Sequence, residues 1–134
     1  MSNGLYNSAR QLFATGALNW AAGSFDVALV DNTYAPLFAN DDTVSDIPST
    51  AILTPFQALS GISVLAGWCK AANVTVPGFF SSTPITGIVI AQNNGGAQGT
   101  WPLIAYLDTG SGFGFFGNGN PVSLNWSANG VFQV

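Results

Sequence analysis

Apolar residues at helical spacing open the chain. Four of them would share one face of a helix: Leu5, Ala9, Leu12 and Phe13. Asn3 is a residue type that caps the N-terminus of helices, and Gly16 is typical of the residue at which a helix ends. The pattern therefore predicts one α-helix between Asn3 and Gly16.

After Gly16 the pattern changes to short apolar runs bounded by Gly, Pro, Asn and Asp, which is typical of β-sandwiches and barrels. Residues 88–90 are apolar without alternation, which indicates a strand buried on both faces. Strands are expected at 25–30, within 56–65, and at 74–76, 85–91, 103–107, 122–126 and 131–134. The predicted fold is mainly β, an antiparallel β-sandwich of jelly-roll type with one N-terminal α-helix.

Length and turn sequences predict how these elements are joined. We expect a single domain over residues 1–134, in which 1–20 form the helix and a connector and 21–134 form the sandwich. Asn and Gly at 93–96 favour a turn, so the strand at 103–107 should return beside 85–91. Asn129-Gly130 is a strong hairpin signal and predicts that the last two strands pair with each other.

Composition narrows the function more than it narrows the fold. Charged residues make up 6% of the 134-residue chain, against about 25% in an ordinary soluble domain, and there is no His or Glu. A Ser or Cys nucleophile would lack its His base, and zinc would lack its usual ligands. Cys69, the single cysteine, is predicted to be a buried thiol. We therefore expect no enzyme activity and no cofactor.

The charge balance bears on partners. The chain has two basic residues, six Asp and a net charge of −4. Two cations cannot neutralise a run of phosphates, so neither a nucleic acid nor an anionic membrane surface is an expected partner. The sequence shows no spanning-length apolar run and no secretory signal, and synthesis in the cytoplasm is expected. So few charges on a chain that is 48% hydrophobic favour a protein that packs against copies of itself or a partner.

A polar stretch at residues 39–50 is predicted to be a long loop, and it holds three carboxylates: Asp41, Asp42 and Asp46. Oxygen ligands of this kind bind calcium, but the spacing is not that of an EF-hand. The candidate calcium ligands also include three residues before the loop or at its start: Asp31, Asn32 and Asn40. A solvated loop is the favoured interpretation, with calcium binding left open. Asp41, Asp42 and Asp46 are also candidates for contact with another protein.

A Gly- and Phe-rich stretch at 110–119 is the second candidate contact. Residues 112–117 match G-x-G-x-x-G, but the Asn-Gly-Asn-Pro that follows breaks helices, which argues against dinucleotide binding. Phe113, Phe115 and Phe116 would be a liability on a free surface, so we expect them either to contact a partner or to insert into the core.

Four tryptophans leave a different class of function open. Aromatic faces stack on sugars, so a glycan- or receptor-binding module is the competing hypothesis, although Trp in such strands is more often part of the core. Glycoside hydrolysis by paired carboxylates is the weakest alternative. The residues concerned are Trp20, Trp68, Trp101 and Trp126.

The order of motifs resembles a family of small structural proteins encoded in tailed bacteriophages and prophages. The resemblance covers most of the chain, and its motifs are structural. The matching residues are Leu5, Tyr6, Leu12, Gly16, Trp20, 27–31, Tyr34, 45–48, 103–108, Gly119, Val122, Trp126 and 130–132. The chain departs from the family pattern in having fewer charged residues, which points to stronger self-association.

The resemblance implies a virion component and carries no catalytic residue onto this sequence. A capsid decoration (cement) protein on the outer surface of the head, made in the host cytoplasm, is the preferred role because the chain is short and lacks heptads and repeats. Its implied partners are copies of itself, with a trimer favoured, and the major capsid protein. A neck, tail or fibre-associated component is the alternative.

Overall fold

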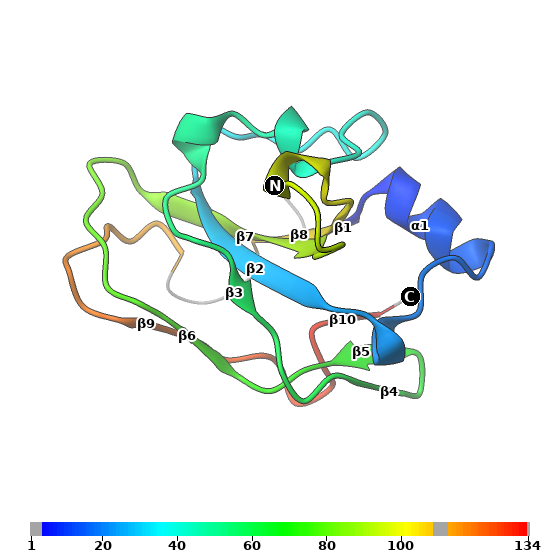
Figure 1. Cartoon of the computed structure of the whole chain (residues 1–134). Coiled ribbons are helices and arrows are strands. Elements are labelled where there is room, and N and C mark those ends of the chain that lie inside the picture. The colour runs from blue at the N-terminus through cyan, green and yellow to red at the C-terminus, as the bar shows by residue number, and fades with distance from the viewer. Residues whose placement is uncertain (1–3, 109–112, 134) are drawn as a thin grey trace.

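The structure, a computed structural model, describes residues 4–108 and 113–133 and is mainly β, with antiparallel sheets and one α-helix (Figure 1). This confirms the predicted fold class. The elements are β1 (Gly4–Leu5), α1 (Asn7–Ala14), β2 (Phe25–Asp31), β3 (Gln57–Ala58), β4 (Ser63–Leu65), β5 (Trp68–Lys70), β6 (Val74–Val76), β7 (Ile85–Gln92), β8 (Leu103–Leu107), β9 (Val122–Leu124) and β10 (Phe132–Gln133). Short 3-10 helices are η1 (Trp20–Ala22), η2 (Val44–Asp46), η3 (Ser49–Ala51) and η4 (Gln98–Thr100).

A five-stranded sheet in the order β1-β8-β7-β2-β3 forms the centre of the molecule. All seven residues of β2 are buried, because β7 and β3 flank the strand and other layers cover both faces of the sheet. Ala28 lies opposite Val89 and Leu29 opposite Ile88, so apolar side chains meet across the central pair. The apolar runs predicted to be central strands, and the pairing of β7 with β8, are confirmed.

Two smaller sheets lie on one side of the central sheet, and η2, η3 and η4 lie on the other (Figure 1). One has the order β10-β5-β4 and the other pairs β6 with β9. This layering is compatible with a sandwich, while the jelly-roll connection stays a prediction. The N-terminal segment belongs to the central sheet, because β1 pairs with β8.

The helix begins later than predicted. It starts at Asn7, and Tyr6 occupies the N-cap position without a side-chain cap; Asn3 lies outside the described residues. Leu5 belongs to β1 instead, opposite Ala105, because pairing with the edge of β8 buries its side chain. The predicted end is confirmed: Gly16 has φ of +77° and its N–H donates to the carbonyl of Phe13.

The predicted C-terminal hairpin is wrong. β9 pairs with β6, and β10 pairs with β5, which sequence patterning did not predict. The indole N–H of Trp126 donates to the carbonyl of Ala72 over 3.0 Å, and its backbone N–H donates to the side chain of Asn73 over 3.0 Å. These bonds hold the segment after β9 against residues 72–73, between the two small sheets. After the turn at Asn129-Gly130 the chain therefore lies beside β5, and β10 pairs with β5 rather than with β9.

The single strand expected within residues 56–65 is two short strands in different sheets. β3 pairs with β2, whereas β4 forms a hairpin with β5. The two residues that close this hairpin, Ala66 and Gly67, have φ of +53° and +82°. Positive φ at both central positions is the type I′ pattern, and Ala is an uncommon residue there.

Candidate functional site

Two of the three carboxylates in the polar loop are used inside the fold. Asp41 is buried, and its Oδ2 accepts the Tyr34 hydroxyl over 2.8 Å and the N–H of Leu37 over 3.0 Å. The hydroxyls of Tyr34 and Tyr6 are 2.6 Å apart, so Tyr6 donates to Tyr34. Burial raises the pKa of both phenols, which therefore stay protonated. Asp41 thus anchors the loop to the core.

Asp46 is the third residue of η2 and takes part in a capping box with the N-cap residue Thr43. Its Oδ2 accepts the backbone N–H groups of Asp42 and Thr43 over 2.8 and 3.1 Å. These backbone bonds hold the pKa of Asp46 below its ordinary value. Asp42 is exposed. Across residues 4–108 and 113–133 no group of three or more His, Cys, Asp or Glu side chains could hold a metal ion.

The Gly- and Phe-rich stretch is paired with a second segment rather than free. Residues 114–119 run antiparallel to residues 78–85, and we call the two segments the glycine ribbon. Their backbones are joined by Gly119 N–H to Phe79 O at 2.8 Å, Ser81 N–H to Gly117 O at 3.2 Å, Ile85 N–H to Phe115 O at 2.7 Å and Gly114 N–H to Ile85 O at 2.7 Å.

Glycine makes this close approach possible. A Cβ on Gly78 would lie 2.0 Å from the carbonyl oxygen of Gly119, and a Cβ on Gly117 would lie 2.6 Å from the ring of Phe79. Neither position can carry a side chain without separation of the two segments. Residues 110–112 of the predicted stretch lie outside the described residues.

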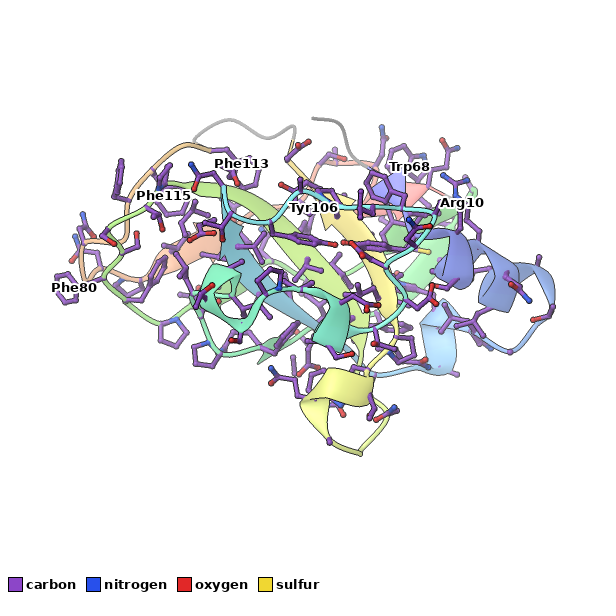
Figure 2. The ribbon with its side chains drawn as sticks, turned by 90° about the horizontal axis from the view of Figure 1, so that it is seen from above. Arg10, Trp68, Phe80, Tyr106, Phe113 and Phe115 are labelled. Carbon is purple, nitrogen blue, oxygen red and sulfur yellow. The ribbon has the colours of Figure 1, made fainter. Side chains whose placement is uncertain are left out.

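The phenylalanines of the glycine ribbon differ in exposure. Phe113 and Phe115 are partly buried against the core, whereas Phe116 is 54% exposed. Phe80 is 83% exposed and lies at the end of the molecule opposite Arg10 and Trp68 (Figure 2). Phe80 was not among the predicted contact residues, although Pro77-Gly78-Phe79-Phe80 repeats the Gly and Phe pattern of its partner segment.

Three of the four tryptophans are held in the fold by their indole groups. Trp20 is buried, stacks on Phe25 at 4.3 Å and donates to the carbonyl of Lys70. Trp101 donates to the carbonyl of Gly96. Trp126 makes the bond to Ala72 described above. Trp68 is half-buried, as is Trp126, and it lines a cleft, so a ligand could reach it.

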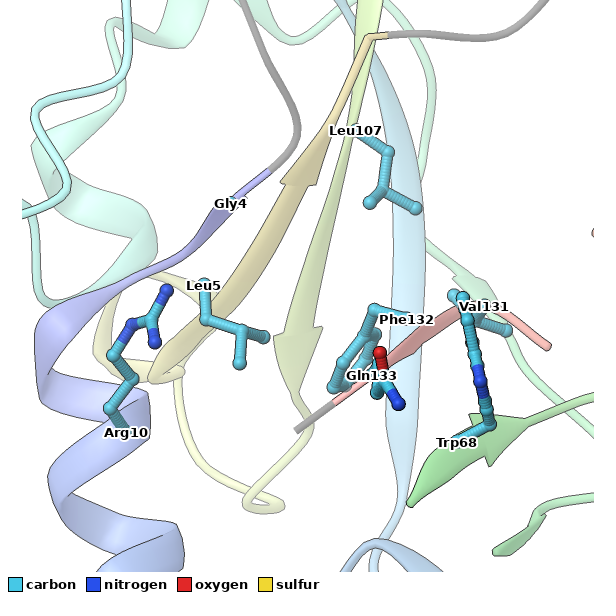
Figure 3. Close-up of a pocket in the computed structure, with 8 residues that line it drawn as sticks. All are labelled: Gly4, Leu5, Arg10, Trp68, Leu107, Val131, Phe132 and Gln133. Carbon is cyan, nitrogen blue, oxygen red and sulfur yellow. The ribbon is translucent and has the colours of Figure 1, made fainter. Parts of the chain in front are cut away.

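This cleft has a volume of about 270 Å³ and lies where α1, β1, β5, β8 and β10 meet; we call it the Arg10 cleft. Arg10 stands on one side and Trp68 on the other, with Leu5, Phe132 and Gln133 between them (Figure 3). Arg10 was not among the predicted site residues, because no local pattern in the sequence predicts that the helix and β5 share a cleft.

The single cysteine and two of the loop carboxylates are held within the fold. Burial raises the pKa of the Cys69 thiol to about 11, so the thiol is protonated at neutral pH and is a poor nucleophile. One carboxylate oxygen of Asp41 and one of Asp46 each accept two hydrogen bonds from nearby residues. The exposed apolar side chains include the rings of Phe80 and Phe116, and the Arg10 cleft lies at the opposite end of the molecule from Phe80 (Figure 2).

Within the residues that the structure describes, no helix is both long and apolar enough to cross a membrane. Comparisons of the chain with models of protein families, with curated proteins and with solved structures found no match.

Proposed function

We propose that the protein is a non-enzymatic structural component of a bacteriophage virion, and that it serves as a capsid decoration protein. The observation that carries the binding role is the exposure of Phe80 and Phe116 on a hydrogen-bonded ribbon. The proposal that the protein belongs to a virion is based on the resemblance of its sequence to small phage structural proteins. The scarcity of charged side chains supports a protein that works in contact with others.

The glycine ribbon is suited to binding because its backbone is already ordered. Hydrogen bonds between the two segments order the backbone that carries Phe80 and Phe116 before any partner arrives, so binding loses little backbone entropy. Full burial of a Phe side chain contributes about 1.5–3 kcal/mol. Two such rings give a modest contact per copy.

Repetition on a symmetric shell makes modest contacts sufficient. If several copies of the protein are joined to one another, the second and third contacts with the shell become intramolecular, and total affinity rises steeply. A decoration protein therefore needs an exposed apolar surface and few charges. The exposed rings of Phe80 and Phe116 and the 6% of charged residues support this role.

The experiment is co-sedimentation of the purified protein with phage heads that lack it, after light scattering has given its oligomeric state. We expect a trimer that pellets at hundreds of copies per head. If the protein does not bind heads but co-sediments with tails, it is a neck or tail component rather than a decoration protein. A protein that binds neither would refute the virion role.

A matched pair of variants tests the contact surface. We expect Phe80→Ser with Phe116→Ser to abolish co-sedimentation with little change in melting temperature, because both rings are exposed. The control, Leu37→Ser with Leu65→Ser, removes apolar side chains that are 56% and 64% exposed outside the ribbon. Equal loss in both variants would show that general hydrophobicity, not the ribbon, drives binding.

A further inference from the structure

We propose that the Arg10 cleft binds a sugar that carries a carboxylate, with Arg10 holding the carboxylate and Trp68 stacking on the sugar ring. The cleft lies at the opposite end of the molecule from Phe80 (Figure 2), so this site is separate from the surface proposed to contact the capsid.

The charge of Arg10 selects an anion. Arg10 is one of only two basic residues, against six Asp, yet no ion pair joins it to a carboxylate among residues 4–108 and 113–133. It is exposed on α1 and lines the cleft, where its guanidinium lies beside β1 (Figure 3). A guanidinium presents parallel N–H donors that match the two oxygens of a carboxylate.

The opposite wall and the floor select a ring with an apolar face. The Trp68 indole is seen edge-on in Figure 3, so one of its faces is turned towards the cleft. Apolar side chains of Leu5, Leu107, Val131 and Phe132, all less than 10% exposed, complete the lining. A sugar ring has one C–H-rich face that can lie on an aromatic ring and hydroxyls that can face solvent.

The remaining polar group and the size narrow the ligand further. Gln133 is exposed beside the cleft and offers both an amide donor and a carbonyl acceptor for hydroxyl groups. The volume of about 270 Å³ is just below the range of about 300–1,000 Å³ for drug-sized ligands. The cleft therefore has room for one sugar unit, such as the acidic end of a glycan.

The test is a titration of the full chain with N-acetylneuraminic acid and with glucuronic acid, followed by the NMR signal of the Trp68 indole N–H. Neutral glucose and N-acetylglucosamine are the ligand controls. We expect one or both acids to shift the Trp68 signal and to leave those of Trp20, Trp101 and Trp126 unchanged, with dissociation constants of about 1 mM or weaker. Neutral sugars should produce no shift.

Two variants with the same charge change separate a site from general attraction. Arg10→Gln should weaken binding of the acid by about 10-fold or more, the loss expected for one charge-assisted contact. Lys70→Gln also removes one positive charge, but Lys70 does not line the cleft, so affinity should stay at the wild-type value. The two-dimensional spectrum of Arg10→Gln shows whether the fold is kept.

Several outcomes would overturn the proposal. These are the absence of a Trp68 shift with either acid, equal shifts with neutral sugars, or equal losses in Arg10→Gln and Lys70→Gln. Tighter binding of a short acidic peptide than of either acidic sugar would show that the cleft takes polypeptide instead. The capsid experiment is independent, since Phe80 and Phe116 take no part here.

Discussion

The central pair β2–β7 and the glycine ribbon are both antiparallel pairings, but side chains stabilise the first, whereas the second requires positions without a side chain. Side chains on both faces of β2 are buried, and the pairing continues from Phe25 opposite Gln92 to Asp31 opposite Ile85. The ribbon has isolated bridges and close approach where Gly78 and Gly117 have no side chain. One pairing exists because of its side chains, and the other exists because side chains are missing.

This difference decides which residues are available to a partner. Every ring or branched side chain of the central pair is needed for the core, so none is free to bind. In the glycine ribbon the backbone carries the pairing, and rings such as Phe80 can stay exposed without loss of structure. Exposed apolar side chains on an ordered backbone are therefore the signature of the ribbon.

The largest expected effect comes from the central pair. Ile90 is fully buried on β7, so Ile90→Ala should lower the free energy of unfolding by about 2–5 kcal/mol. Phe80→Ala should change it by less than about 0.5 kcal/mol. Urea unfolding of both variants measures the contrast. A Phe80 variant as unstable as the Ile90 variant would show that the exposed ring is part of the core.

A smaller effect is expected where the ribbon has no room. The Cβ added by Gly78→Ala would meet the carbonyl oxygen of Gly119, and the forced separation should cost about 1–3 kcal/mol. The matched control is Gly99→Ala, whose Cβ would lie 3.6 Å from Ser45, an ordinary contact.

Hydrogen exchange of the Gly119 and Ser81 N–H groups locates the damage. Both should lose protection in Gly78→Ala and keep it in Gly99→Ala. Unchanged protection in Gly78→Ala would mean that the ribbon does not depend on a missing side chain.

The smallest expected effect on stability concerns the two carboxylates of β2, Asp26 and Asp31, whose pKa values shift in opposite directions. Burial raises the pKa of Asp26, and a hydrogen bond with Asn93 only partly offsets it. Burial also acts on Asp31, but hydrogen bonds from Thr33 and from Thr83 of the ribbon outweigh it and lower its pKa. Ionised Asp26 therefore weakens the fold and ionised Asp31 strengthens it.

The two substitutions to Asn should therefore change the free energy of unfolding in opposite directions, and unfolding measured across a range of pH tests this. At neutral pH, Asp26→Asn should stabilise the protein, with a gain that shrinks as pH falls through the raised pKa and protonates the wild type. Asp31→Asn should destabilise it at neutral pH, with a loss that disappears as pH falls through the lowered pKa. Shifts of the same sign in both variants would contradict this account.

The contrast also explains what sequence patterning could and could not predict. The sequence was sufficient to predict β2, β7 and β8, because a continuous apolar run is stable only where both of its faces are buried, as in a central strand. It was not sufficient to predict β5, because its hairpin turns at Ala66 and Gly67, and Ala is rarely a signal for positive φ. Asn129-Gly130 gave a correct turn but the wrong partner strand, since Trp126 bonds made elsewhere redirect the chain.

The candidate site residues also differ in how far the sequence could predict them: local composition identified some, and others depend on contacts between distant parts of the chain. Phe113, Phe115 and Phe116 were singled out from local composition, and the structure separates the exposed Phe116 from its two packed neighbours. The roles of Asp41 and Asp46 as loop anchors depend on Tyr34 and on the capping box, which only folding brings into contact. The Arg10 cleft joins segments from both ends of the chain, so no window of sequence contains it.

The pairing of β2 with β7 has a consequence for the chain during synthesis. β2 emerges from the ribosome early, but its residue Asp26 lies opposite Ala91, which is made much later, and translation proceeds at about 5–20 residues per second. For those seconds the apolar core of β2 can pair only with the two-residue strand β3, and its longer partner β7 is still missing. Chaperone binding during translation should therefore be strongest between the emergence of β2 and that of β7.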